Sequence, residues 1–179
     1  MEETLVVNLY GAPGSGKSTG AAYIFAKLKM LGINCELITE FAKDKVWENN
    51  LEVFNNQLYI LGKQSFKISR VLGKVDVIIT DAPLYNNMLY LPKEQEHLFD
   101  AYKKIISDFS SKYDNFHYYI ERVKPYNPNG RHQTEEESDK IGKKFKEKLL
   151  KNSIPIYSVN GDINGYDSII ENIVNHFKN

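Results

Sequence analysis

The chain has 179 residues, a length that suits one domain with a sizeable hydrophobic core. Its 23 basic residues balance its 23 acidic residues, so it lacks the positive excess of dedicated nucleic-acid binders. A content of 42% hydrophobic and 12% aromatic residues excludes a disordered chain. The single cysteine excludes an intrachain disulfide and a cysteine zinc site, and no apolar run approaches the roughly 20 residues of a membrane span. We therefore expect a cytoplasmic protein without a membrane partner.

Short apolar runs alternate with longer helical patterns along the whole chain. The runs that predict strands are residues 4–10, 35–39, 75–80, 116–120 and 154–159. The patterns that predict helices are residues 17–31, 50–72, 92–110, 134–151 and 166–177. Such alternation predicts a parallel sheet with helices on both faces, and ligands bind such sheets beyond the carboxyl ends of the strands.

The segment between the first strand and the first helix fits the phosphate-binding pattern G-x-x-x-x-G-K-S. Its glycines let backbone N–H groups turn toward phosphate oxygens, and the following helix adds its positive dipole end. We expect Lys17 to reach the β- and γ-phosphates of ATP, and the Ser18 hydroxyl to ligate Mg²⁺. The residues predicted to bind the nucleotide are Gly11, Ala12, Pro13, Gly14, Ser15, Gly16, Lys17, Ser18 and Thr19.

This motif narrows the fold class to an α/β P-loop NTPase. We expect a three-layer sandwich in which a five-stranded parallel sheet, in the order 2-3-1-4-5, carries helices on both faces. A single domain is predicted over residues 1–179, with a short lid at residues 123–133.

The third predicted strand runs directly into Asp81. Four apolar or small residues followed by an aspartate fit the second motif of P-loop proteins, whose carboxylate holds Mg²⁺ directly or through water. The alternative is a simple turn cap, because strands often end at aspartate. With the phosphate loop upstream, we expect Asp81 to bind metal and to act in catalysis.

The second predicted strand ends next to Glu40, where P-loop kinases of small molecules face the acceptor. Glu40 could accept the proton of an acceptor hydroxyl during phosphoryl transfer. A solvated carboxylate at a helix entry is the alternative. Phe41, Trp47 and Tyr59 could stack on a nucleobase, although aromatic residues at such spacing are more often part of a core.

The predicted lid is a loop rich in Asn, Pro and Gly between the fourth strand and a charged helix. Arg122 and Arg131 flank it, and the planar guanidinium group suits recognition of triphosphates. The alternative for each arginine is a surface ion pair. Thr134 and Glu137 form the pattern of a capping box, so the acidic run there is interpreted as a helix start and not as a metal site.

These residues together resemble the ribosylnicotinamide-kinase domain of NadR-like proteins, within the P-loop nucleoside and nucleotide kinases. The segments that carry the resemblance are residues 11–18, 40–44, the region around Gln64, Asp81, Gly130 with Arg131, and residues 154–157. The resemblance implies that Glu40, Phe41, Lys43 and Gln64 lie at the substrate, and Trp47 is expected there because its ring could stack on a base. The sequence departs from the NadR-like pattern at three places near the substrate and the lid. Lys43 replaces an arginine, Thr39 replaces a tryptophan, and Asn127 and Asn129 replace acidic residues. The acceptor can therefore differ from that of the family.

The leading prediction is a kinase that uses ATP and Mg²⁺ to phosphorylate a small nucleoside or nucleotide. One alternative is a polynucleotide or hydroxymethyl-base DNA kinase, for which Lys43, Lys45, Lys63 and Lys67 could supply a basic trough. The other is a nucleotide-binding switch or ATPase without a small acceptor. The zero net charge favours the small acceptor over nucleic acid. The excess of Lys and Asn is compatible with a bacteriophage origin, and the sequence leaves the oligomeric state open.

Overall fold

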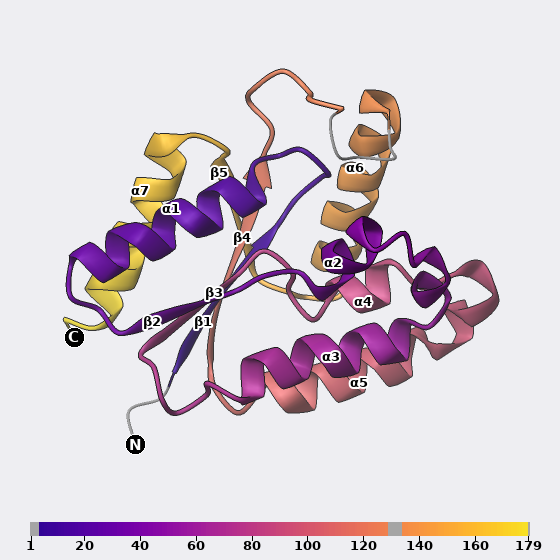
Figure 1. Cartoon of the computed structure of the whole chain (residues 1–179), viewed down its shortest axis with the longest axis horizontal. Coiled ribbons are helices and arrows are strands. Elements are labelled where there is room, and N and C mark those ends of the chain that lie inside the picture. Colours follow the sequence, from indigo (N-terminus) through magenta and orange to yellow (C-terminus); the bar gives the residue numbers. More distant parts are fainter. Residues whose placement is uncertain (1–3, 129–133, 179) are drawn as a thin grey trace.

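The chain folds around one five-stranded sheet, as seen in a computed structural model that describes residues 4–128 and 134–178 (Figure 1). The strands are β1 (Leu5–Tyr10), β2 (Cys35–Ile38), β3 (Val77–Thr80), β4 (Asp114–Glu121) and β5 (Ile156–Asn160). All pairings are parallel, and the order is β2-β3-β1-β4-β5, as predicted. Every residue of β1 is buried, because this central strand is covered on both faces.

Helices cover both faces of the sheet. The helices are α1 (Lys17–Met30), α2 (Phe41–Trp47), α3 (Gln57–Ser69), α4 (Asn86–Leu89), α5 (Phe99–Ser110), α6 (Glu135–Lys151) and α7 (Ile163–His176). One apolar cluster joins α1 and α7 to the sheet, and a second joins α3, α4, α5 and α6 to the opposite face (Figure 1). No helix in the described part of the chain is long and apolar enough to cross a membrane.

The helix predicted over residues 50–72 is wrong in its first part. A short 3₁₀ helix, η1 (Leu51–Asn55), precedes α3, and the two are separated at Asn56. The side chain of Asn56 accepts a hydrogen bond from the Tyr59 N–H, 3.0 Å away, and so caps α3. The apolar spacing predicted one continuous helix because it does not register the interruption at Asn56.

The helix predicted over residues 92–110 is also divided. Residues Lys93–Leu98 form a 3₁₀ helix, η2, after Pro92, and α5 begins at Phe99. The predicted capping box before α6 is confirmed, since Thr134 and Glu137 exchange side-chain and backbone hydrogen bonds. This cap fixes the start of α6 where the chain returns from the predicted lid.

Candidate active site

The phosphate loop lies between β1 and α1, at the carboxyl edge of the sheet. Gly11, Gly14 and Gly16 adopt positive φ angles of 147°, 84° and 107°, a region that favours glycine. The Lys17 ammonium group donates hydrogen bonds to the carbonyl oxygens of Gly11 and Ala12, at 2.9 and 3.0 Å. The Lys17 side chain therefore lies across the phosphate loop that the sequence motif predicts.

Helix α6 packs directly on one side of this loop. The Ser138 hydroxyl donates to the Pro13 carbonyl oxygen at 2.6 Å. A Cβ atom on Gly142 would lie only 2.8 Å from the Ala12 side chain, so the absence of a side chain lets the helix approach. The two small residues of α6 thus support the phosphate loop from the side of the lid.

Helix α7 supports the other side of the loop. The Tyr166 hydroxyl donates to the Gly16 carbonyl oxygen at 3.0 Å, and its ring fills the space above Gly20. The turn before α7 brings Gly161 against the backbone of Ser15, where a Cβ atom would overlap the Ser15 carbonyl oxygen. The loop is therefore held in shape from both sides by packing and hydrogen bonds.

We expect Gly161→Ala to destabilise the protein and to weaken ATP binding. The added methyl group must displace the Ser15 backbone, and overpacking of this kind costs about 1–3 kcal/mol. Thermal unfolding and ATP titration would measure both effects. Gly62→Ala is the matched control, because a Cβ there meets no atom within 4 Å and alanine favours the helix. Equal behaviour of the two variants would contradict the proposed support of the loop.

Asp81 follows β3 and lies beside the loop with only 6% of its surface exposed. Its Oδ1 atom is buried without a hydrogen-bond partner in residues 4–128 and 134–178, and so is the Ser15 hydroxyl. Buried polar atoms are rarely left unsatisfied, so this pair indicates a place for a ligand. A carboxylate and a hydroxyl group are ligands that Mg²⁺ prefers, and the binding of Mg²⁺ by Asp81 and Ser18 stays a prediction.

We expect Asp81→Asn to lower turnover roughly a hundredfold, because the amide keeps the shape but removes the negative charge. The variant should also need more Mg²⁺ for half-maximal rate. Steady-state kinetics across a Mg²⁺ series would measure both quantities. A normal rate with a normal Mg²⁺ requirement would show that Asp81 only caps the strand.

Glu40 is half-buried at the entry to α2, directly after β2. Burial raises the pKa of its carboxyl group, and the positive charge of Lys17 opposes this shift. The negative charge of Asp81 raises the pKa further. These effects agree with the topology, because Glu40, Lys17 and Asp81 follow β2, β1 and β3, whose carboxyl ends are neighbours at one edge of the sheet. The structure thus brings three predicted catalytic residues together.

Gln64 is 2% exposed, and both ends of its amide contact the turn between β2 and α2. Its Oε1 accepts from the Phe41 N–H at 3.1 Å, and its Nε2 donates to the Thr39 carbonyl oxygen at 3.5 Å. Gln64 therefore holds Glu40 in place through the backbone on either side of it. A direct contact between Gln64 and substrate stays a prediction.

The other predicted substrate residues lie on α2. Trp47 is 71% exposed, so it is not part of the core. Lys43 is exposed and Phe41 is half-buried. Lys43 still acts on Glu40, because its charge opposes the rise in that carboxyl pKa.

Arg122 anchors the described start of the lid to α6. Its guanidinium group contacts Asp139 at 2.5 Å and Glu135 at 3.2 Å, and it lies over the Tyr126 ring. The surface ion pair considered from the sequence is thus present, and a contact with nucleotide stays a prediction. Arg131 lies outside the described residues, and so does part of the predicted lid.

Sequence reasoning missed two side chains near these groups. A Cβ atom on Gly16 would lie 3.7 Å from the Lys124 ammonium group, so this lysine reaches over the phosphate loop. Tyr90 packs its ring edge-to-face on Phe145, and burial together with the charge of Glu40 raises its pKa. Lys124 lies between Arg122 and Arg131 in the sequence. The prediction for the lid relied on the planar geometry of guanidinium groups, which a lysine does not have.

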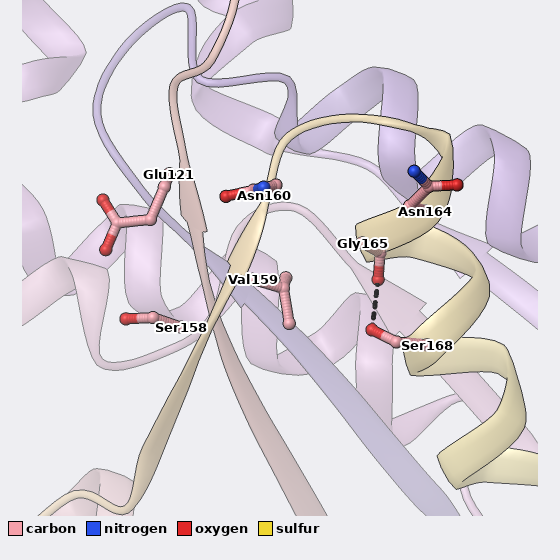
Figure 2. Close-up of a pocket in the computed structure, with 7 residues that line it drawn as sticks. All are labelled: Glu121, Ser158, Val159, Asn160, Asn164, Gly165 and Ser168. Atoms are coloured by element: carbon pink, nitrogen blue, oxygen red, sulfur yellow. Dashed lines mark hydrogen bonds between the residues drawn. The ribbon is translucent and has the colours of Figure 1, made fainter.

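A cavity of about 400 Å³ lies where β5 ends and α7 begins (Figure 2). Its lining consists of Glu121, Ser158, Val159, Asn160, Asn164, Gly165 and Ser168. Figure 2 shows Val159 on the side of β5 that faces α7, with Glu121 and Ser158 on the other side. The cavity lies next to the turn that contains Gly161, and hence beside the phosphate loop.

The strand order, the phosphate loop after β1 and the carboxylate after β3 define a P-loop nucleotide-binding protein. A family model described as an AAA domain matches residues 6–165. The chain belongs to this family. No curated protein matches the sequence.

Three solved structures show the same fold. NadR in complex with NR matches with a TM-score of 0.72 and 19% identity, over 97% of this chain and 51% of that chain. Deoxyadenosine kinase from M. mycoides with bound dATP matches with a TM-score of 0.58 and 19% identity, over 97% of this chain and 100% of that chain. Thymidylate kinase from Ehrlichia chaffeensis matches with a TM-score of 0.64 and 14% identity, over 97% of this chain and 99% of that chain. This chain spans about half the length of the NadR chain, and the expected likeness to NadR-like P-loop kinases is confirmed in the fold.

Proposed function

We propose that this protein transfers the terminal phosphoryl group of ATP to a hydroxyl group of a nucleoside or nucleotide. The observation that carries the proposal is the grouping of Lys17, Asp81 and Glu40 at the carboxyl edge of β1, β3 and β2. A cation for the phosphates, an acid for the metal and a half-buried base for the acceptor are the parts that this reaction needs.

The donor nucleotide fits the loop with its phosphates on the N-terminus of α1. Lys17 already lies across the loop and would exchange the carbonyl oxygens of Gly11 and Ala12 for phosphate oxygens. Mg²⁺ held by Ser18 and Asp81 would neutralise charge on the β- and γ-phosphates. The nucleoside part of ATP would lie on the side of Lys124 and α7, away from Glu40.

The acceptor would then lie between the phosphate loop and α2. Glu40 would accept a hydrogen bond from the attacking hydroxyl and take its proton as the phosphoryl group is transferred. The ligands bound in the similar structures, NR and dATP, support a nucleoside-like molecule at one or other end of this site.

The test is a screen of acceptors with the purified protein, ATP and Mg²⁺. Nicotinamide riboside, deoxyadenosine and thymidylate would be offered separately, and products would be identified by mass spectrometry. We expect a new phosphorylated product together with an equal amount of ADP. ADP released without any phosphorylated acceptor would contradict the proposal and support the ATPase.

We expect Lys124→Gln to weaken ATP binding by about three- to tenfold, with a smaller effect on turnover at saturating ATP. The lysine is exposed, so the lost charge contact with phosphate is worth about 1 kcal/mol. Isothermal titration with ATP would measure the change. Lys140→Gln is the control, because Lys140 pairs with Glu136 on the exposed face of α6. An effect of the same size in both variants would remove Lys124 from the site.

A further inference from the structure

Helices α2 and α3 present a surface on which aromatic rings alternate with lysines. The Phe41 and Tyr59 rings are 5.7 Å apart and meet edge-to-face. Lys45 and Lys67 lie over the Phe41 ring, at 5.3 and 6.0 Å from its centre, and Lys63 lies 5.4 Å from the centre of the Tyr59 ring. We call these five residues the aromatic–lysine surface. It starts at the residue after Glu40.

Large side chains extend this surface instead of being buried. Phe66 is 67% exposed and lies seven residues after Tyr59, which places it on the same face of α3. Trp47, at the end of α2, is exposed as well. Exposed rings gathered beside a site usually mark a place where another molecule binds. From Tyr59 to Phe66 the face is about 10 Å long, the length of about three stacked bases.

The charge of this region is positive, although that of the whole chain is zero. Helix α2 with its C-terminal cap and α3 together carry four lysines against two carboxylates. Lys45 pairs with Glu48 at 2.5 Å, and Lys67 lies 3.8 Å from Asp44. The remaining two lysines of the set, Lys43 and Lys63, have no ion pair among residues 4–128 and 134–178.

We propose that the aromatic–lysine surface binds single-stranded nucleic acid, so that the nucleoside phosphorylated at Glu40 can be one residue of a strand. The inference rests on the proposed kinase function and names the class of acceptor. Unpaired bases stack on aromatic rings whatever their sequence, and lysines between the rings contact the phosphates. Because Phe41 follows Glu40 and is fixed by Gln64, a strand on this surface reaches the acceptor position directly.

A duplex fits this surface less well than a single strand. The rings project from the faces of two helices, and bases inside a duplex do not expose their flat sides to such rings. The net excess of two positive charges suits a short stretch of strand with a few phosphates. The surface therefore favours unpaired nucleotides that flank the acceptor.

The test is a titration of the protein with a short oligothymidylate, without ATP. The one tryptophan of the chain, Trp47, reports binding by a change in fluorescence. We expect binding to weaken with salt at a logarithmic slope of about −1.4, for two phosphates contacted on a single strand. Lys63→Gln should reduce this slope by about 0.7, and Tyr59→Ala should weaken binding about tenfold.

Two matched variants serve as controls. Lys112→Gln removes an exposed lysine after α5 that pairs with Asp108, outside this surface, and Tyr157→Ala removes an exposed tyrosine of β5. Neither should change the affinity or the salt slope. Equal losses in the controls, equal affinity for heparin, or no binding at all would overturn the proposal. Self-association of the protein through Trp47 in sedimentation would also overturn it, since a second copy would then cover the surface.

A transfer assay separates this inference from the kinase function. Oligonucleotides with a free hydroxyl would be offered beside free nucleosides, with ATP and Mg²⁺. Transfer to nucleosides without binding of oligothymidylate refutes the nucleic-acid surface and leaves the kinase. Binding of oligothymidylate without transfer to any acceptor refutes the kinase and leaves the surface as a binding site.

Discussion

Replacing Lys17 with alanine is expected to reduce phosphoryl transfer at least about a thousandfold. The Lys17 ammonium group reaches across the phosphate loop to the carbonyl oxygens of Gly11 and Ala12, where the phosphates of ATP would lie. Removing one charged donor aimed at developing negative charge costs about a hundred- to a thousandfold in rate. Weaker binding of ATP adds to this loss. Turnover and ATP affinity, measured by initial rates and titration, give the two contributions.

The control for this variant is Lys27→Ala. Lys27 lies on the same helix, α1, but its ammonium group lies over the Tyr23 ring at the far end from the loop. Both variants should keep the circular dichroism and the cooperative unfolding of the parent chain. A folded Lys17→Ala protein with full turnover would end the assignment of the phosphate loop.

Replacing Glu40 with glutamine is expected to lower phosphoryl transfer by a hundredfold or more, while ATP still binds. A positioned base contributes about a hundred- to ten-thousandfold, and the amide cannot accept the proton. Because burial raises the Glu40 pKa, the rate of the parent chain should fall in acid above the usual range of a glutamate. This acid limb should disappear in the variant. Rates of a single turnover across pH would measure both effects.

The stability of the variant gives an independent check on Glu40. The raised pKa means that folding disfavours the ionised carboxylate, so the charge lowers stability at pH values above the folded-state pKa. This cost disappears as the pH falls through that pKa and the group becomes neutral in the folded state. Glu40→Gln should therefore raise the melting temperature at pH 8 and change it less at pH 4. A destabilised variant at pH 8 would point to a structural role of Glu40.

The sequence predicts the sheet and the phosphate loop well because both depend on local patterns. The buried strands are short apolar runs, and the loop needs glycines at fixed positions, of which Gly11, Gly14 and Gly16 have positive φ. The order of the strands follows from the class of protein that the loop defines. These features do not depend on which distant side chains meet.

The features that the sequence does not predict depend on a local cap or on contacts between side chains from separate elements. The break at Asn56 depends on one cap within an apolar pattern that is otherwise continuous. The partners of Arg122 lie on α6, more than ten residues away, so a lone arginine could not reveal whether it meets a carboxylate or a phosphate. The positions of Lys124 and Tyr90 likewise depend on how separate elements pack.

The two ends of the site differ in how firmly they are built, and this sets an order of events. The phosphate loop is held by α6 and α7, whereas none of the seven residues of α2 is buried. In hydrogen exchange, the amides of α2 should open locally at a low free energy, while the hydrogen-bonded amides of α1 from Gly20 onward exchange slowly. ATP would then bind to a preformed phosphate loop at little entropic cost. The acceptor would bind last, because its binding must order α2.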